Sequence, residues 1–360
     1  MNREEALLEF REKVAYPLCK KTREEFMESL EIYYDGFKDE IIRKIKKIIE
    51  VANKRDNYNL VVFQIELLRT AILDESYRFY IHGYNEMWYL DEDDIVEEID
   101  LKYLFKPYIN LKEALLKEKK IYLGKVNNYD VESILYEAVT EVWLNLIEIA
   151  RALFWDLDEE PWIKENIKSQ FYFVKWGEYQ GKNETVFAMD YRKKTNKDME
   201  AILKIDKSKN PFVYSSWINS TFDNLDLSEN KMVFINLKGS VFEKINFQDS
   251  YIVKGQCDNA VFRDCNFTNC KMVSTSFKNV TIENCIFDNG LLRNTTFKDA
   301  QLSNVSFKNA NLCDANLSGI KHKNLDFTEA DVEGALFDVM EIPFLHLSAE
   351  QLQTIYIEEE

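Results

Sequence analysis

Residues 310–319 read Ala-Asn-Leu-Cys-Asp-Ala-Asn-Leu-Ser-Gly, which is two successive five-residue units with leucine at the third position of each. The same spacing runs far beyond this stretch, because every fifth residue from Trp217 to Leu317 is apolar. His322 interrupts the series, and the apolar positions resume at Phe327. Helices repeat every 3.6 residues and strands every two, so a period of five indicates neither a simple helix nor a simple strand.

Two further columns accompany the central apolar one. The residues two positions before each centre are mostly small or apolar, as in the run from Ala260 to Ala315. The residues two positions after each centre are mostly Asn or Asp, as in the run from Asp264 to Asp314. Asn and Asp tolerate left-handed backbone angles and bond to their own main chain. Each unit is therefore predicted to have one large inward side chain, one small inward side chain and a corner.

This pattern resembles the pentapeptide-repeat family, whose units read Ala-(Asp/Asn)-Leu followed by two variable residues, over about residues 217–345. The resemblance implies a right-handed quadrilateral β-helix in which four units form one coil and residue i stacks on residue i+20. About six coils are then expected, and at the ~4.8 Å spacing of neighbouring strands they form a rod about 29 Å long. Residues 347–352 resemble the short capping helix that often closes such rods, and the acidic tail Glu358–Glu360 follows.

The chain before the repeats has a different pattern. The stretches 58–80 and 130–153 carry apolar residues at helical spacing, which predicts amphipathic helices. Short runs rich in β-forming residues follow from Phe171 onward, and a solenoid needs its terminal edge covered. The expected fold class is α plus β-solenoid, with an all-α helical bundle at 1–170, a β-rich connector and solenoid N-cap at 171–216, the pentapeptide-repeat β-helix at 217–345, and a C-terminal capping helix and acidic tail at 346–360.

Composition excludes several classes of protein. The chain has 360 residues, 46% apolar and 14% aromatic, which is enough to fill a core and excludes global disorder. No apolar run reaches the roughly 18–20 residues of a membrane span, and residues 1–20 lack the apolar core of a signal peptide. Six cysteines suit a reducing compartment. A cytoplasmic bacterial protein is therefore expected. The net charge of −17 argues against direct binding of nucleic acid or of an anionic membrane.

Recognisable catalytic motifs are absent. The three histidines lie far apart, and no nucleophile, phosphate-loop, dinucleotide or zinc motif occurs. The sequence thus predicts no catalytic residue, no cofactor and no metal. One group of residues has two possible interpretations, and its members are Glu75, His82, Glu86 and Trp88. On a helix the first three would share a face and could hold a metal or a small ligand, whereas the alternative is a helix end packed with aromatic residues.

Cysteine and histidine positions in the repeats have structural explanations. The cysteines at 257, 265, 270 and 285 occupy inward columns and are expected to fill the core. Cys313 lies one position after a centre, so its thiol is expected to point outward and to be reactive. His322 falls on an inward position and is either buried or located in a bulge.

One surface of the predicted rod is apolar. Val233, Val253 and Val273 are spaced by twenty residues, so they should form one vertical stripe. Apolar patches on a soluble surface mark interfaces, and the stripe would dock either another chain or the N-terminal half. The other predicted members of this candidate interface are Phe234, Tyr251 and Leu291, and the basic residues around it are Lys231, Lys271 and Arg293.

Charge is unevenly distributed along the chain. Residues 217–320 contain eleven acidic and ten basic residues, whereas residues 326–360 contain ten acidic and no basic residues. Some members of the family resemble B-form DNA, bind DNA gyrase or topoisomerase IV and confer quinolone resistance. That mechanism needs a densely negative rod, which the near-neutral repeats do not favour.

We therefore expect a non-enzymatic protein–protein interaction or scaffold protein, and an immunity or antagonist role acting by binding fits this expectation. The identity of the partner is open, and a homodimer through the rod face or the C-terminal end is a further expectation. The alternatives are a DNA mimic that protects gyrase or topoisomerase IV, and a ligand sensor or enzyme in the helical bundle.

Overall fold

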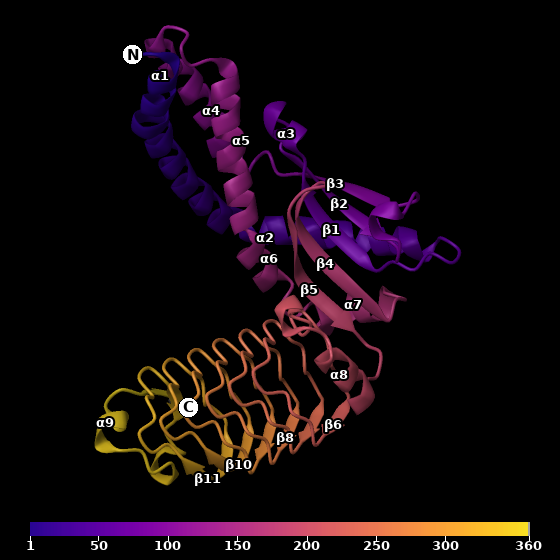
Figure 1. Ribbon diagram of the computed structural model, residues 1–360, viewed down its shortest axis with the longest axis vertical. Helices are drawn as coiled ribbons and strands as arrows, with labels where there is room; N and C mark the ends of the chain where they lie inside the picture. Colours follow the sequence, from indigo (N-terminus) through magenta and orange to yellow (C-terminus); the bar gives the residue numbers. More distant parts are fainter. Residues whose placement is uncertain (359–360) are drawn as a thin grey trace. The chain divides into compact units, whose positions relative to one another are not determined.

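The computed structural model describes residues 1–358 and divides the chain into two compact units, Met1–Ala188 and Met189–Glu360 (Figure 1). The division falls inside the segment 171–216 that was expected to connect the two halves. Glu359 and Glu360 of the expected acidic tail lie outside the described residues. No helix within residues 1–358 is both long and apolar enough to cross a membrane.

The N-terminal unit combines helices with a five-stranded sheet. Its strands are β1 (Val62–Leu67), β2 (Arg78–Tyr84), β3 (Ile95–Asp100), β4 (Phe171–Glu178) and β5 (Asn183–Asp190). They are ordered β3-β2-β1-β4-β5, with β1 antiparallel to β2 and parallel to β4. Its helices are α1 (Arg3–Phe10), α2 (Tyr16–Asn53), α3 (Arg69–Leu73), α4 (Lys106–Glu118), α5 (Asn128–Asn145), α6 (Ile147–Leu153) and α7 (Pro161–Asn166), with a π-helical segment at Arg11–Ala15 and 3₁₀ turns at Trp88–Leu90, Lys119–Tyr122 and Leu157–Glu159.

Aromatic side chains hold one face of this sheet against the helices. The Trp143 ring of α5 stacks on Phe79 of β2 and on Trp176 of β4, with ring centroids 4.2 Å apart in both pairs. Trp143 Nε1 donates to the Gly177 carbonyl at 2.7 Å, and Trp176 Nε1 donates to the Trp143 carbonyl at 2.9 Å. The indole N–H groups are thus satisfied inside the core. Since side chains alternate along a strand, the residues next to Phe79 and Trp176 point to the opposite face.

Helices dominate residues 1–170, but the expected all-α bundle is wrong because three strands lie in this range. The stretch 58–80 contains β1, where Phe63, Ile65 and Leu67 alternate with polar residues at a period of two. This central strand is buried on both faces, so its apolar run also fits a helical period. The stretch 130–153 is helical but forms two helices, α5 and α6, that meet at Leu146.

The C-terminal unit is a solenoid preceded by a short helix. It comprises α8 (Asn196–Leu203), a 3₁₀ turn at Lys207–Lys209, and the strands β6 (Thr221–Asp223), β7 (Val241–Glu243), β8 (Val261–Arg263), β9 (Thr281–Glu283), β10 (Gln301–Ser306) and β11 (Lys321–Asp326), followed by β12 (Leu336–Asp338), a 3₁₀ turn at Ile342–Phe344, α9 (Ala349–Leu352) and β13 (Tyr356–Glu358). Neighbouring strands pair in parallel at a register of twenty residues. Seven such steps lead from Ser216 to Tyr356, close to the expected six coils (Figure 1).

The predicted corners are confirmed by the backbone angles. Every fifth residue from Asn219 to Gly334 has a positive φ, between 48° and 71°. Even Glu229, Phe234 and Lys254 adopt this conformation, which is strained for residues other than Gly, Asn and Asp. Inter-coil hydrogen bonds over-determine these corners, as where the Phe234 N–H donates to the Val253 carbonyl at 3.0 Å.

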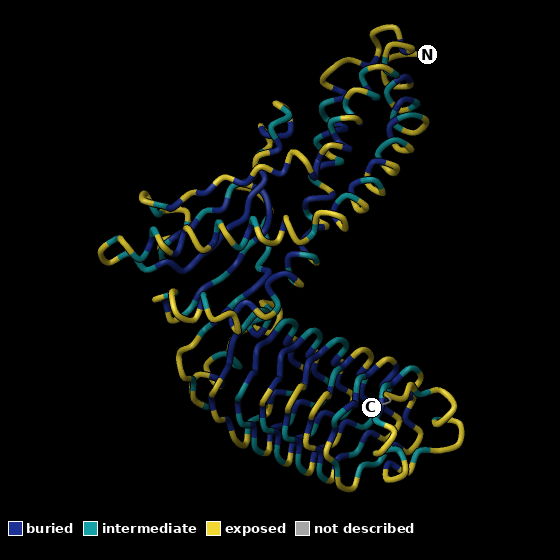
Figure 2. The backbone as a smooth tube through the Cα atoms, turned by 180° about the vertical axis from the view of Figure 1, so that it is seen from behind, coloured by how far each residue is buried: buried dark blue, intermediate teal, exposed yellow. Residues whose placement is uncertain are grey.

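The interior is apolar and aromatic, as the columns predicted. Phe267 is almost fully enclosed and stacks on Phe247 at 4.7 Å and on Phe287 at 4.6 Å between ring centroids. A second column stacks Phe277 on Phe297 at 4.9 Å. Figure 2 shows buried positions recurring from coil to coil. Because each coil packs only on its neighbours, the unit is a stiff, quasi-one-dimensional stack.

The cysteines at 257, 265, 270 and 285 are buried in the solenoid core, as expected. Cys313 lies outside that core, but its thiol is covered instead of being accessible as predicted. The side chain of the next coil covers this thiol: Cys313 Sγ donates to Asp331 Oδ2 at 3.0 Å, and only 8% of the residue is exposed. Burial and the neighbouring carboxylate raise the pKa of the Cys313 thiol to about 11.

The C-terminal cap closes the last coils. His322, whose position was open between burial and a bulge, is largely enclosed, and its Nε2 lies 3.0 Å from Glu341 Oε2. Ser348 begins α9 by accepting from the Gln351 N–H at 3.2 Å. Gln351 Nε2 donates to the carbonyls of Phe327 and Ala330, at 2.9 and 2.8 Å. The expected short capping helix is present and is tied to the solenoid through these bonds.

Candidate functional site

A polar cluster lies on the face of the sheet opposite the tryptophan pair. Gln64 and Glu66 of β1 point to this face, and Gln64 pairs with His82 of β2. Both β1 side chains are completely inaccessible to solvent, and burying a polar group costs free energy unless hydrogen bonds compensate for the lost water. The turn Trp88–Leu90 encloses them: Trp88 Nε1 donates to Gln64 Oε1 at 2.8 Å, and Gln64 Nε2 donates to the Tyr89 hydroxyl.

His82 lies between two carboxyl groups. Its Nδ1 is 2.6 Å from Asp94 Oδ2, and its Nε2 is 3.4 Å from Glu66 Oε2. The imidazole also stacks on Tyr84, at 5.4 Å between centroids and 7° between planes, and on Tyr179 at 5.9 Å. The ring is therefore held in one orientation, and both nitrogens already face a carboxyl group.

Glu66 is the most unusual group of this cluster. Its Oε1 accepts from Gln64, whereas its Oε2 has no hydrogen-bond partner among the described residues. Burial raises the pKa of Glu66 to about 8, although the bond from Gln64 opposes the shift. The carboxyl is thus mostly protonated at neutral pH.

A cavity of about 470 Å³ opens beside this histidine. It is lined by three tyrosines, two aspartates, His82 and the β4–β5 turn, namely His82, Tyr84, Tyr89, Asp91, Asp94, Tyr179, Gln180, Gly181 and Asn183. Burial raises the pKa of Tyr84 and of Tyr89, so both keep their hydroxyl protons. Asp91 is held as an acceptor by the Tyr58 hydroxyl at 2.5 Å and by the Asn85 N–H at 2.8 Å.

The structure brings together only part of the pocket predicted from sequence. His82 lines the cavity, whereas Trp88 is not among the lining residues and donates to Gln64 behind them. Glu75 lies elsewhere, at a positive φ of 59°, with Lys112 Nζ 2.6 Å from its Oε1. Glu86 accepts from Asn59 Nδ2 at 2.6 Å. The expected helical face is wrong because His82 belongs to a strand and the other three lie in turns.

Sequence reasoning missed most residues of the cavity. The signal for Gln64 and Glu66 was available, since two polar residues alternate with the apolar residues of β1. Asp94 and Tyr179 carried no such signal. Asp94 reaches His82 because it directly precedes β3, which pairs with β2. Tyr179 follows β4 and reaches His82 only because β4 pairs with β1 across more than one hundred residues of sequence.

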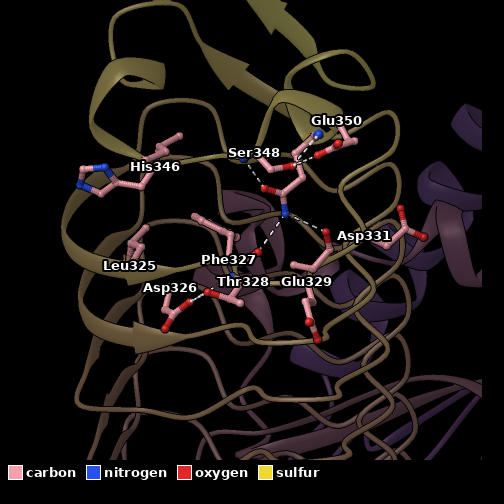
Figure 3. Close-up of a pocket in the computed structure, with 12 residues that line it drawn as sticks. Leu325, Asp326, Phe327, Thr328, Glu329, Asp331, His346, Ser348 and Glu350 are labelled. Atoms are coloured by element: carbon pink, nitrogen blue, oxygen red, sulfur yellow. Dashed lines mark hydrogen bonds between the residues drawn. The ribbon is translucent and has the colours of Figure 1, made fainter.

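A second cavity, of about 680 Å³, lies at the end of the solenoid (Figure 3). Asp326, Glu329, Asp331 and Glu350 surround it, and His346 lies at its edge. The carboxylates at 329, 331 and 350 belong to exposed residues, so this cavity is an open acidic surface under the capping helix. Cys313, Asp331 and Glu333 lie close enough to share an ion, but the two acidic residues are exposed.

The predicted apolar stripe is present on one face of the rod. Residues 231, 251, 271 and 291 stack through successive bridges, and the valines at 233, 253 and 273, like Leu291, are half-buried. Tyr251 is 43% exposed, and Lys271 Nζ lies 4.8 Å from its ring centroid. Phe234 stacks on Tyr214 at 4.7 Å. Whether this face is an interface stays a prediction.

Comparisons with known proteins agree with the repeat pattern. Residues 260–337 match the family model described as a pentapeptide repeat region. No match was found among curated proteins.

Several solved structures are similar over part of the chain. A pentapeptide repeat protein from the thylakoid lumen of Arabidopsis thaliana shares 22% identity, covering 32% of this chain and 72% of that one, at a TM-score of 0.23. A trypsin-treated variant of QnrB1, a plasmid-mediated fluoroquinolone resistance protein, shares 16% identity. The match covers 41% of this chain and 85% of that one, at a TM-score of 0.22. HetL from the cyanobacterium Nostoc, a pentapeptide repeat protein involved in regulating heterocyst differentiation, shares 12% identity. The match covers 34% of this chain and 81% of that one, at a TM-score of 0.14. The five-residue columns, the left-handed corners and the family match identify the solenoid of the C-terminal unit as a pentapeptide repeat region.

Proposed function

We propose that this protein is a non-enzymatic binding protein whose solenoid presents a stiff surface to a protein partner. The observation that carries the proposal is the face around Tyr251, where an exposed aromatic ring lies beside half-buried valines on a rigid support. Such a surface loses little conformational entropy when it binds, because its backbone is already held by the ladder between coils.

The composition of this face indicates the chemistry of the partner. Tyr251 lies between Lys231 and Lys271 in the stack, and Val253 is beside it. Aromatic anchors surrounded by polar groups dominate binding energy in protein interfaces. A partner with an apolar patch and acidic neighbours would therefore complement the first coils. An immunity or antagonist role needs only such binding.

The geometry of the N-terminal unit supports binding rather than catalysis. A general base needs a nitrogen open toward the substrate, whereas both nitrogens of His82 face carboxyl groups. No nucleophilic serine or cysteine is among the described residues that line this cavity.

DNA mimicry is less well supported than protein docking. Bases are interspersed with acids along the rod, as where Arg263 lies between Glu243 and Glu283, with N–O distances of 3.2 and 2.8 Å. A polyanion mimic instead needs an uninterrupted negative face. Inhibition of gyrase supercoiling by the purified protein would reverse this preference.

The test uses the intact chain and two matched variants. Val253→Asp places a charge in the stripe, and Gln248→Asp places one at the equivalent position of the neighbouring face, one residue after the buried Phe247. Partners are captured from lysate of the cells of origin, and the interaction is reconstituted with the purified candidate. The proposal requires a partner that binds the wild type and Gln248→Asp but not Val253→Asp. Equal binding by all three proteins would place the interface elsewhere. Sedimentation of the purified chain tests separately whether it forms a homodimer.

A further inference from the structure

The cavity beside His82 has the composition of a ligand site, independently of any surface on the solenoid. Its volume of about 470 Å³ falls within the roughly 300–1,000 Å³ of small-molecule sites. Behind its wall, Gln64 and Glu66 are fully enclosed, and one carboxyl oxygen of Glu66 has no hydrogen-bond partner within residues 1–358. A buried polar atom without a partner calls for an explanation, and a role in binding is one such explanation.

Charge in the cavity is one-sided. Asp91 and Asp94 line it, and neither lysine nor arginine is among the described residues that do so. The ammonium of Lys175, which is half-buried, lies 4.5 Å from the Trp88 ring centroid. Within the described residues, Asp94 uses only Oδ2, toward His82, so Oδ1 is available to a ligand. These carboxylates favour a positive charge and disfavour an anion.

Aromatic rings supply the second half of the recognition chemistry. Tyr84, Tyr89 and Tyr179 contribute three rings to the lining, and Tyr179 is 42% exposed at the mouth. Aromatic faces attract cations within about 6 Å of the ring centroid, and tyrosines combined with carboxylates recognise ammonium and guanidinium groups.

A metal ion fits the same groups poorly. His82 directs its two nitrogens to different carboxyl groups on opposite edges of the ring, so Glu66, His82 and Asp94 do not converge on one point. Among residues 1–358, the metal-compatible cluster of three side chains is the one at Cys313, in the other unit. An organic cation needs no such convergence, since its charge is spread over several N–H groups.

We infer that this cavity binds a small organic cation, with a guanidinium or ammonium group held by Asp94 and Asp91 and packed against the tyrosines. His82, stacked on Tyr84 and Tyr179, acts as a positioning residue that fixes the orientation of Asp94. Asn183 donates to the Tyr89 hydroxyl at 3.3 Å and holds that side chain at the rim. The inference does not depend on the proposed protein docking, which concerns the solenoid.

The probe is methylguanidinium, with N-methylurea as a neutral compound of the same shape. Binding to the intact ¹⁵N-labelled protein is followed by the indole N–H signal of Trp88, whose Nε1 donates to Gln64 behind the cavity wall. For so small a ligand a dissociation constant on the order of millimolar is expected. Methylguanidinium should shift this signal saturably, and methylurea should not.

Two variants and a control make the outcome decisive. Asp94→Asn should weaken binding about tenfold through loss of a charged hydrogen bond. Tyr179→Ala, at an exposed position that tolerates truncation, should weaken it about threefold to fivefold. Glu98→Gln, on the neighbouring strand and outside the lining, should leave it unchanged. No saturable binding of methylguanidinium, equal binding of methylurea, or unchanged affinity in folded Asp94→Asn and Tyr179→Ala would each overturn the inference.

Discussion

Replacing Glu66 by glutamine should change the pH dependence of stability in a defined direction. The side chain is fully enclosed in β1, and burial raises the pKa of Glu66 to about 8 from an ordinary value of 4.5. Glutamine has nearly the same shape and can still accept from Gln64, but it carries no titratable proton. The variant therefore removes the titration and keeps the packing.

The direction in which the free energy of unfolding changes with pH follows from the number of protons that each state binds. Between the two pKa values the folded protein holds a proton on Glu66 that the unfolded chain has released, so the free energy of unfolding falls as pH rises. Full linkage gives about 1.4 kcal/mol per pH unit, or about 2 kcal/mol between about pH 6 and about pH 7.5. Above about pH 8 the group is ionised in both states and the dependence levels off.

The assay is urea unfolding of wild type and Glu66→Gln at several pH values, followed by the fluorescence of the buried Trp143 and Trp176. Glu98→Gln is the control, because Glu98 is 44% exposed and pairs with Arg78 at the surface. The free energy of unfolding of Glu66→Gln should gain about 2 kcal/mol on the wild type over this range. Parallel curves for wild type and Glu66→Gln would refute the buried, protonated carboxyl.

Two further predictions concern the solenoid, and a third concerns one cysteine in each unit. Phe267→Ala should destabilise the repeats by about 3–5 kcal/mol through loss of stacking and a residual cavity, seen as faster hydrogen exchange in the adjoining coils; unchanged exchange would contradict the stacked core. Asn279→Ala, at a corner with φ of 54°, should cost about 1–2 kcal/mol in chemical unfolding, whereas Asn279→Gly should cost less. Because the pKa values of Cys19 and Cys313 are raised to about 11, thiol modification near pH 8 should be about a hundredfold slower in the native than in the unfolded protein, and rapid labelling of Cys313 would show that its cover is missing.

The solenoid could be predicted from sequence because its decisive contacts recur at a constant spacing. Phe247, Phe267 and Phe287 stack on one another at intervals of twenty residues, so the period that appears in the sequence is the period of the packing. The corner column could be predicted as well, because each Asn or Asp favours the left-handed backbone conformation that its corner requires. The thiol of Cys313 was predicted to be accessible, but a side chain of the next coil, that of Asp331, covers it.

The cavity beside His82 depends on pairing between strands, which no local sequence pattern indicates. Gln64, His82 and Tyr179 come together only through the order β3-β2-β1-β4-β5, in which β1 pairs with β4 across more than one hundred residues. The sequence by itself determined the coil, its corners and its core, because each coil interacts with neighbours at a fixed distance along the chain. Only the tertiary structure decided that Glu66 is buried and that acids and tyrosines converge around one histidine, because strand pairing over long separations has no period that a sequence can display.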